Sequence, residues 1–278
     1  MRLSLLREEL LEMENTLSDP RLEVRVLLSH LGISTTAQIA HSDMEVDDRT
    51  ACKAKALFQR RIEGTPMAYI TNEKEFYGHT FYVDENVLIP RPDTEVLVEK
   101  AVQIYRDKSY SGSILDLCTG SGAVAASLAY ELRRSVCYSD ISRAALETAK
   151  RNYLKITGEE GDGREGDLFE PWKGERFSLI ATNPPYLTER WYEDTEKSVK
   201  KEPLSAFLGY GDDGLDMIKK IVSTSPQVLE KNGTLLIECD YRQAGALRTV
   251  LEEHGFGDIG TAKDLAGRER VVYGEYKG

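Results

Sequence analysis

The stretch Ser113-Ile114-Leu115-Asp116-Leu117-Cys118-Thr119-Gly120-Ser121-Gly122 decides the fold of this chain. An apolar run that is typical of a buried strand enters a turn with two glycines, which permit a tight bend and the close approach of a ligand to the backbone. No Lys-Ser or Lys-Thr pair follows the glycines, and the spacing is not that of the dinucleotide fingerprint. The stretch therefore predicts a strand, a ligand-binding turn and a helix, without a phosphate loop.

Downstream of this turn, strand-like and helix-like segments alternate. We predict strands at 114–117, 136–139, 177–181 and 234–238, with helices after Gly122, from Ser142, near 215–229 and over 243–254. Alternation at this spacing predicts βαβ units and a parallel sheet with helices on both faces. The last two strands, 257–261 and 271–275, are too close in sequence for a crossover helix, so an antiparallel hairpin at the edge of the sheet is expected.

The segment that precedes residue 64 is predicted to be helical. Asp19 and Pro20 form the start signal of one helix, and Asp47 or Asp48 that of another. In the first of these helices the apolar residues recur at helical spacing, and they are Leu22, Val26, Leu27 and Leu31.

From Lys74 the apolar period shortens, and β-prone runs around Gly78 predict a hairpin. Pro90 and Pro92 exclude a helix in the segment that contains them. A helix is predicted to begin after Asp93 or Thr94, either of which could cap it. The expected fold class is thus α/β with a small N-terminal helical bundle. Its parts are a helical domain at 1–72, a β-hairpin linker at 73–92 and an α/β domain at 93–278.

Acidic residues follow three of the predicted strands. Asp116 could accept hydrogen bonds from an ammonium group, Asp140 from two ribose hydroxyls, and Asp167 from an exocyclic purine amine. An adenosine with a cationic amino-acid tail would satisfy all three. Each acid alone has an ordinary structural explanation such as a helix cap, and it is their order and separation that indicate one crevice. The predicted cofactor-binding set is Asp116, Cys118, Thr119, Gly120, Ser121, Gly122, Asp140, Ile141, Asp167, Leu168, Phe169 and Asn183.

Asn183-Pro184-Pro185-Tyr186 follows the next strand and is the candidate catalytic turn. The Asn183 side-chain oxygen and the Pro184 carbonyl can both accept from one NH2 group, and the Tyr186 ring offers a flat surface for a conjugated nitrogen. The prolines fix φ and remove backbone donors. The turn therefore suits an amide or an aryl amine as its ligand. The alternative is a turn without a binding role, because Asn-Pro is a common dipeptide in turns.

Composition limits the function further. The 278 residues carry 36 basic and 47 acidic side chains, a net charge of −11 that argues against wrapping free nucleic acid. No apolar run approaches membrane-spanning length, and the N-terminal segment lacks a signal-peptide pattern. The four cysteines are scattered, which predicts reduced thiols and no metal site. We expect a cytoplasmic protein.

These residues resemble the S-adenosylmethionine-dependent class I methyltransferases, and the PrmC/HemK family in particular. Beyond the Asn-Pro-Pro-Tyr turn, the family-like stretches are Gly64 to Ile70, Phe76 to Gly78, Leu88 to Glu95, Glu202-Pro203, Asp213 to Leu215 and Ala266 to Val271. The Asn-Pro-Pro-Tyr turn also occurs in enzymes that methylate adenine N6. The Ile89-Pro90-Arg91-Pro92 string with Thr94 and Glu95 is therefore the feature that best distinguishes the PrmC/HemK family from those enzymes.

The resemblance implies a Rossmann-like catalytic domain behind a helical substrate-docking domain. It implies methyl transfer from S-adenosyl-L-methionine, leaving S-adenosyl-L-homocysteine, to the glutamine amide nitrogen in the Gly-Gly-Gln loop of peptide chain release factors. The enzyme would act as a monomer. Arg91 and Glu95 are candidate substrate-binding residues beside Asn183-Pro184-Pro185-Tyr186, or else an ion pair that ties the linker to the catalytic domain.

The chain also departs from the family pattern. Cys118, Asn72 and Tyr210 occupy positions where the family usually has glycine, and Asp240 one where it often does. Leu168 occupies a position where the family often has an aromatic residue. The alternatives are an N6-adenine nucleic-acid methyltransferase, a glutamine methyltransferase of a ribosomal protein, and a non-catalytic adenosine-binding module.

Overall fold

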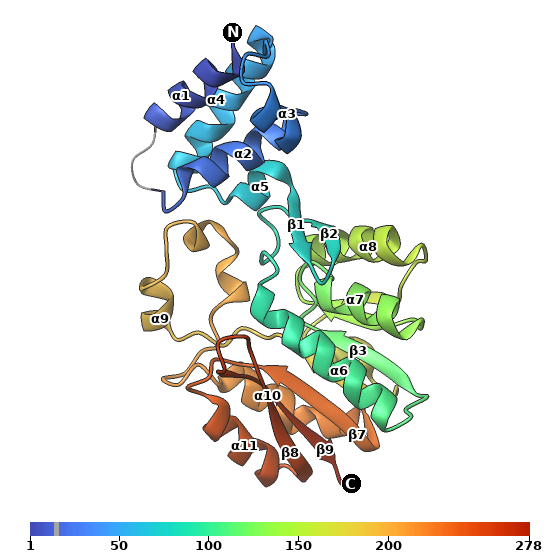
Figure 1. Cartoon of the computed structure of the whole chain (residues 1–278). Helices are drawn as coiled ribbons and strands as arrows, with labels where there is room; N and C mark the ends of the chain where they lie inside the picture. The colour runs from blue at the N-terminus through green and yellow to red at the C-terminus, as the bar shows by residue number, and fades with distance from the viewer. Residues whose placement is uncertain (14–16) are drawn as a thin grey trace. The chain divides into compact units, whose positions relative to one another are not determined.

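The computed structural model describes residues 1–13 and 17–278. The chain forms two compact units (Figure 1). The first contains Met1–Glu73 together with Glu196–Lys201, and the second contains Lys74–Thr195 with Glu202–Gly278. The short 196–201 segment, which includes the 3-10 turn η3 (Val199–Lys201), was not expected to belong to the helical unit.

The helical unit comprises α1 (Leu3–Glu12), α2 (Pro20–His30), α3 (Thr35–Ala40), α4 (Asp48–Ile62) and α5 (Met67–Thr71). Asp19 caps α2 by accepting from the Leu22 amide at 3.0 Å, and Asp47 caps α4 by accepting from Thr50 at 2.9 Å. The helix expected from the apolar spacing is present as α2, although Leu22 and Val26 of that pattern are exposed. The helix instead buries its 24, 27 and 28 positions against α1 and α4.

The second unit begins with the predicted hairpin. Strands β1 (Glu73–Phe76) and β2 (His79–Tyr82) pair through a two-residue loop, in which Tyr77 and Gly78 both have positive φ. Two successive positive φ values are those of a type I′ turn, whose twist matches that of paired strands. The side chain of Asn152 holds the hairpin against α8 (Arg143–Thr157), since it accepts from the Tyr82 amide and donates to the Tyr82 carbonyl, both at 2.8 Å.

A seven-stranded sheet forms the core of this unit, in the order β5-β4-β3-β6-β7-β9-β8. The strands are β3 (Ser113–Leu117), β4 (Cys137–Asp140), β5 (Gly163–Glu165), β6 (Phe177–Thr182), β7 (Leu229–Glu238), β8 (Phe256–Lys263) and β9 (Glu269–Tyr276). β3 to β7 are parallel, whereas β9 is antiparallel to both β7 and β8, so the expected antiparallel hairpin at the edge is confirmed. β5 was missed because its three residues lack an apolar pattern.

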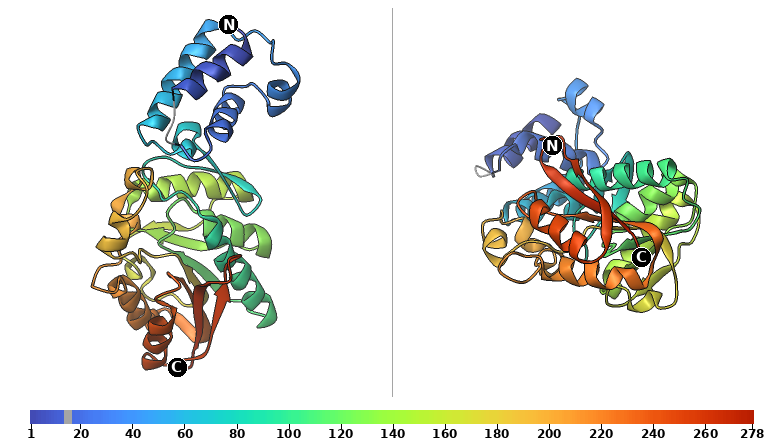
Figure 2. Two further views of the ribbon diagram at one scale, coloured as in Figure 1. Left: turned by 60° about the vertical axis from the view of Figure 1, so that its left-hand side comes forward. Right: turned by 90° about the horizontal axis from the view of Figure 1, so that it is seen from below.

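The sheet lies between two layers of helices, as Figures 1 and 2 show. The side chains of its strands alternate between these layers. Ile114 of β3 packs with α6 (Glu95–Asp107), α7 (Ala123–Leu132) and α8, whereas its neighbour Leu115 packs in the opposite layer with α10 (Asp216–Thr224) and α11 (Ala244–Glu253). Burial on both faces explains why these strands are nearly continuous apolar runs. Short elements complete the unit: α9 (Glu189–Glu193), η1 (Pro92–Thr94), η2 (Glu170–Trp172), η4 (Leu204–Ala206) and η5 (Ser225–Gln227).

The start of α6 differs from the expectation. Thr94 occupies the N-cap position, but its side chain makes no capping hydrogen bond. The Thr94 hydroxyl accepts instead from Asn183 Nδ2 at 3.2 Å, and the Asp93 carboxylate pairs with Arg270 at 3.1 Å. Both side chains thus bind residues that are distant in sequence. The 3-10 turn η1 therefore leads into the helix without a side-chain cap. Among the helices of residues 1–13 and 17–278, none combines the length and the hydropathy that a membrane span requires.

Asn152 offers a test of how the hairpin is held. The Asn152→Ala substitution removes its hydrogen bonds to Tyr82 and the one from Nδ2 to the Ser121 carbonyl at 2.8 Å. Because buried partners are left unsatisfied, we expect a loss of about 2–3 kcal/mol in the free energy of unfolding. Urea denaturation measures this loss. The control Asn86→Ala, at an exposed asparagine, should change stability by less than about 0.5 kcal/mol.

Candidate active site

The glycine-containing turn after β3 is shaped by the Asp116 carboxylate. Asp116 Oδ2 accepts from the Thr119 hydroxyl at 2.6 Å and from the Ala125 amide at 3.0 Å, so it joins the turn to the first residues of α7. The side chain is buried, and this burial raises the pKa of Asp116 to about 7. One carboxylate oxygen therefore has a structural role that the sequence did not reveal. Contact between Asp116 and an ammonium group stays a prediction.

Asp140 ends β4 and braces the same turn. Its Oδ2 accepts from the Gly120 amide and its Oδ1 from the Ser142 amide, each at 2.9 Å. Burial raises the pKa of this carboxyl as well. Each carboxylate oxygen can accept more than one hydrogen bond, so Asp140 keeps acceptor capacity for a bound hydroxyl. Asp167 differs, because its Oδ2 forms an ion pair with Lys220 Nζ of α10 at 2.7 Å, a partner that the sequence analysis did not identify.

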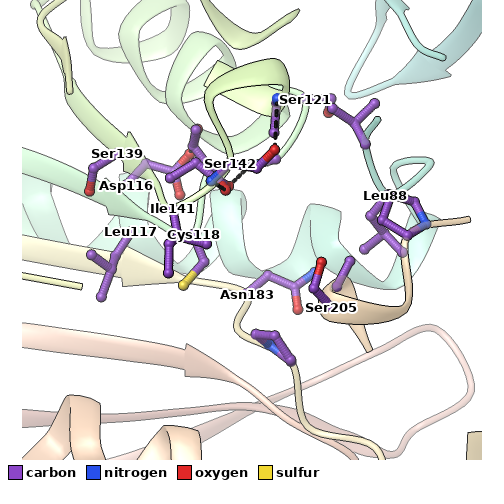
Figure 3. A pocket seen from close by; sticks show the side chains of 18 of the residues that line it. Leu88, Asp116, Leu117, Cys118, Ser121, Ser139, Ile141, Ser142, Asn183 and Ser205 are labelled. Atoms are coloured by element: carbon purple, nitrogen blue, oxygen red, sulfur yellow. Dashed lines mark hydrogen bonds between the residues drawn. The ribbon is translucent and has the colours of Figure 1, made fainter. Parts of the chain in front are cut away.

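A cavity of about 270 Å³ opens over the turn at the carboxyl ends of the strands (Figure 3). Twelve of the predicted site residues line it, namely Arg91, Asp116, Cys118, Thr119, Gly120, Ser121, Asp140, Ile141, Asp167, Leu168, Asn183 and Pro185. Further lining residues were not predicted, among them Leu88, Ser139, Pro203, Ser205, Ala206 and Met217. Most of them are apolar or small and carry no chemical signal in the sequence.

Five predicted site residues do not line the cavity, and they are Glu95, Gly122, Phe169, Pro184 and Tyr186. Phe169 is buried in the layer that contains α10 and α11. A Cβ at Gly122 would lie 2.9 Å from Ala149 Cα, so this glycine permits the close packing of α7 on α8. The Glu95 carboxylate accepts from the Tyr77 amide at 2.9 Å and thereby secures the hairpin.

Arg91 pairs with Glu202 rather than with Glu95. Its Nη2 lies 2.5 Å from Glu202 Oε1, and Glu202 Oε2 accepts from the Ile89 amide at 2.9 Å. Glu202 is buried, which raises the pKa of its carboxyl despite the neighbouring Arg91 charge. The ion pair fixes the 89–91 segment beside the cavity, and Arg91 is one of the residues that line it.

Asn183 directly follows β6, and its amide group has a defined orientation. Nδ2 donates to Thr94, which leaves Oδ1 as the group available for a ligand. Within the described part of the chain, neither Asn183 Oδ1 nor the Pro184 carbonyl accepts a hydrogen bond. Two acceptors on adjacent residues are thus unoccupied at the end of a rigid strand. An arrangement of this kind can receive the two hydrogens of an NH2 group.

The turn itself is held from its outer side. Gln243 Nε2 donates to the Tyr186 carbonyl at 2.8 Å and to the Asp213 carbonyl at 2.7 Å. Gly209 and Gly214 come so close to Tyr186 that a Cβ on either residue would overlap backbone atoms. The Asp213-Gly214-Leu215 string of the sequence thus supports the Asn183-Pro184-Pro185-Tyr186 turn.

Several departures from the family pattern have one backbone property in common. Cys118, Asn72 and Tyr210, which stand where glycine is usual, have φ values of 59°, 56° and 61°. Leu168 also has a positive φ of 48°. Such values cost non-glycine residues roughly 1–2 kcal/mol, less for asparagine. The fourth position where glycine is frequent, Asp240, has no positive φ, and its carboxylate pairs with Arg242 at 2.6 Å.

Comparison with known proteins places this chain among methyltransferases. Residues 6–71 match the family described as the PrmC N-terminal domain, and residues 93–202 match the Methyltransferase small domain. A relative from Neisseria gonorrhoeae named "Release factor glutamine methyltransferase" is 38% identical, over 92% of this chain and 94% of its own length. A relative of the same name from Haemophilus influenzae is 35% identical, over 95% of this chain and 94% of its own length.

Solved structures agree in fold. A methyltransferase from Pyrococcus furiosus superimposes with a TM-score of 0.53 at 16% identity, over 79% of this chain and 97% of that chain. The T. thermophilus 16S rRNA N2 G1207 methyltransferase, in complex with AdoMet and guanosine, gives 0.54 at 19% identity, over 73% of this chain and 49% of that chain. The predicted Rossmann-like methyltransferase fold is therefore confirmed.

A substitution at Gly209 tests how the Asn183-Pro184-Pro185-Tyr186 turn is supported. In Gly209→Ala the new Cβ would lie 2.8 Å from Tyr186 Cα and overlap the Gly214 carbonyl. We expect a loss of stability of about 1–3 kcal/mol together with loss of methyltransferase activity. The matched control is Gly245→Ala in α11, where a Cβ meets nothing within 4 Å, and stability should rise by about 0.5–1 kcal/mol. Equal behaviour of the two variants in denaturation and activity would contradict the supporting role.

The raised pKa of the Asp116 carboxyl leads us to expect that the stability of the fold depends on pH. Its pKa is about 7 in the folded protein, raised by burial from 3.8, so the folded state binds a proton that the unfolded state has released between these values. The stabilisation is fully present below pH 3.8 and is lost as the pH rises through 7. The wild type should therefore lose stability relative to Asp116→Asn as the pH rises from about 5 to 8. Chemical denaturation of both proteins across this range provides the difference, and a difference independent of pH would contradict the assignment.

Proposed function

The chain belongs to the release factor glutamine methyltransferase family, and we propose that it methylates the side-chain amide nitrogen of a glutamine in a peptide chain release factor. The observation that carries this proposal is the pair of unoccupied acceptors at Asn183 and Pro184, beside a cavity that the predicted cofactor residues line. The Gly-Gly-Gln loop implied by the family resemblance is the proposed target.

S-adenosyl-L-methionine is the methyl donor, and the cavity has a donor and acceptor set that suits it. We assign the ribose hydroxyls to Asp140, which retains acceptor capacity, and the adenine ring to the region of Ile141, Asp167 and Leu168. The Gly120 turn permits close approach of the amino-acid tail. When bound, the sulfonium supplies an electrophilic methyl group and leaves as a neutral thioether.

The acceptors solve the main chemical problem, which is the weak nucleophilicity of an amide nitrogen. The nitrogen lone pair is delocalised into the carbonyl group. Asn183 Oδ1 and the Pro184 carbonyl would accept the two N–H hydrogens, orient the nitrogen and stabilise the positive charge that develops there. A carbon–nitrogen bond forms while the carbon–sulfur bond breaks, and one proton then leaves the nitrogen. No base is required before attack.

The same acceptors provide selectivity. Glutamate or an ester lacks the paired donors and would leave both oxygens unsatisfied, at a cost of about 1–3 kcal/mol each. Adenine N6 also carries an NH2 group, so the turn alone does not separate the two substrates. The net charge of −11 favours a protein substrate over free nucleic acid.

We assign substrate docking to the helical unit. The proposed domains are a substrate-docking domain at 1–72, a β-hairpin linker at 73–92 and a methyltransferase domain at 93–278. The enzyme is further proposed to act as a monomer in the cytoplasm, where translation termination takes place, without binding free nucleic acid.

The Asn183→Ala variant tests the central role. It removes one of the two acceptors, and we expect kcat to fall about 10²–10³-fold, as for loss of one preorganised polar group, with little change in the Kd of S-adenosylmethionine. Single-turnover labelling gives the rate, and calorimetry gives the affinity. A variant that methylates at the wild-type rate would contradict the role of Asn183.

Substrate identity is tested with radiolabelled S-adenosylmethionine. We expect label on a release factor and none on its variant with the loop glutamine changed to glutamate. Parallel reactions contain DNA and ribosomal proteins. Label on DNA alone would support adenine methylation instead, and label on a ribosomal protein alone would support the sibling activity.

A further inference from the structure

Arg91 is the lone cationic side chain at the cavity. In the described structure, no other residue that lines the cavity carries a positive charge. Three of the lining residues are acidic, namely Asp116, Asp140 and Asp167. The residues on both sides of Arg91 are prolines, which have no backbone N–H to offer. The Arg91 guanidinium is therefore the main hydrogen-bond donor of its segment, and the methyl-transfer chemistry does not use it.

Glu202 holds this guanidinium and occupies only part of it. Arg91 Nη2 donates to Glu202 Oε1 at 2.5 Å, and Glu202 Oε2 accepts from the Ile89 amide at 2.9 Å. The Glu202 side chain is 2% exposed, whereas the Arg91 side chain is 37% exposed. A guanidinium has five N–H donors in a planar fork. Arg91 therefore has donors left for a ligand.

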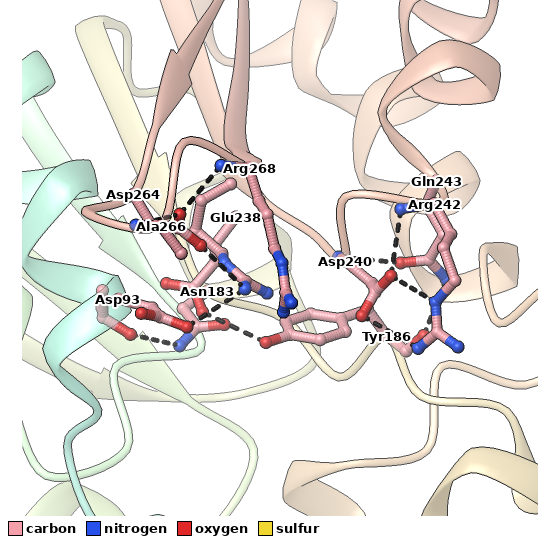
Figure 4. A network of polar contacts seen from close by, with 12 residues as sticks. Asp93, Asn183, Tyr186, Glu238, Asp240, Arg242, Gln243, Asp264, Ala266 and Arg268 are labelled. Atoms are coloured by element: carbon pink, nitrogen blue, oxygen red, sulfur yellow. Dashed lines mark hydrogen bonds and ion pairs between the residues drawn. The ribbon is translucent and has the colours of Figure 1, made fainter.

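Two hydrogen bonds place Arg91 close to Asn183. The Arg91 carbonyl accepts from the Thr94 amide at 3.1 Å, and the Thr94 hydroxyl accepts from Asn183 Nδ2 at 3.2 Å. Behind the turn that contains Asn183, the Tyr186 hydroxyl donates to the buried Glu238 carboxylate at 3.2 Å (Figure 4). Because these side chains fill the space behind the turn, a methyl donor must reach Asn183 from the cavity, which Arg91 also lines.

The chemistry of the reactants identifies the group that Arg91 suits. S-adenosylmethionine has an amino-acid tail that ends in an ammonium and a carboxylate, whereas the side chain of glutamine is neutral. The tail carboxylate is thus the only anion that the two reacting groups bring to the cavity. A short aliphatic chain joins it to the sulfonium, so it must lie near the methyl group that is delivered at Asn183. Guanidinium and carboxylate form charge-assisted hydrogen bonds that are often bidentate.

We propose that Arg91 binds the carboxylate of the S-adenosylmethionine tail. This inference rests on the proposed function, because it takes the cavity as the cofactor site. Arg91 then belongs with the cofactor-binding residues and not with the substrate-binding residues among which the sequence placed it. The tail lies between Arg91 and the Gly120 turn. A cofactor without the carboxylate would bring only positive charges to this cation, and the site would bind it less tightly.

Titration calorimetry with S-adenosylmethionine and with its decarboxylated analogue tests the proposal. The two ligands share the adenosine, the sulfonium and the amino group, so the ratio of their Kd values reports on the carboxylate. We expect the wild type to bind the analogue about 10–100-fold more weakly, the range for a hydrogen bond to a charged group. In Arg91→Met/Glu202→Gln this ratio should fall by about tenfold or more. The double change is used because Arg91→Met alone leaves the buried Glu202 charge unpaired.

Two matched controls keep Arg91 and lose another charge. Glu202→Gln removes the ion pair but keeps an acceptor for the guanidinium, and its Kd ratio should stay close to that of the wild type. Lys220→Met removes a cation that pairs with Asp167 at 2.7 Å and does not line the cavity. Its Kd ratio should also be unchanged, because a distant charge acts on both ligands without contacting the carboxylate.

Equal binding of both ligands by the wild type, or a wild-type ratio in Arg91→Met/Glu202→Gln, would overturn the inference. An equal fall in Lys220→Met would do so too, since it would indicate a general effect of charge. If the double variant does not fold, the decision rests on Arg91→Lys, which keeps the charge but lacks the planar fork. Its ratio should fall, and an unchanged ratio would overturn the inference.

These titrations contain no protein substrate, so they separate this inference from the proposed function. If the wild type labels no release factor, the proposed function fails, whatever the Kd ratios. If it labels the release factor and the Kd ratio does not depend on Arg91, the inference alone fails.

Discussion

The convergence of parallel strand ends at one edge of the sheet is the constraint on which the site depends. β3, β4, β6 and β7 run in the same direction, so Asp116, Asp140, Asn183 and Glu238 reach the same region although up to about half of the chain separates them. Each of these side chains lies at or next to the last residues of a buried strand. The sheet therefore fixes the positions of the strand ends, and the turns that follow carry the hydrogen-bonding groups.

Sequence reasoning identified the strand-end residues because their signal is local. A polar residue after an apolar run, or a glycine pair before a helix, can be recognised without tertiary contacts. The partners of these residues could not be recognised in the same way. Lys220 beside Asp167, Glu202 beside Arg91 and Thr94 beside Asn183 lie 53, 111 and 89 residues apart in sequence. Such pairings depend on how the elements pack, and Glu95 and Phe169 were placed at the cavity although packing directs them elsewhere.

Backbone conformation links the sequence departures to the structure. Cys118, Asn72 and Tyr210 stand where the family resemblance leads us to expect glycine, and all three have a positive φ. The left-handed conformation that glycine adopts freely is thus present at these positions in non-glycine residues, at a cost in conformational energy. Cys118 adds a side chain to the cavity at this cost, and burial raises the pKa of its thiol far above the usual range, so it acts as an uncharged wall of the cavity.

A site that recognises NH2 must present acceptors and keep donors away, and amide side chains carry both. The donor end of the Asn183 amide is occupied by Thr94, so Oδ1 is the end that is left for a ligand. Thr94 accepts this bond from its position on η1, ahead of α6. Behind the turn, the Tyr186 hydroxyl donates to the buried Glu238 carboxylate at 3.2 Å, which ties the aromatic ring to the end of β7. The orientation of the turn therefore depends on partners in η1 and β7 as well as on the turn itself.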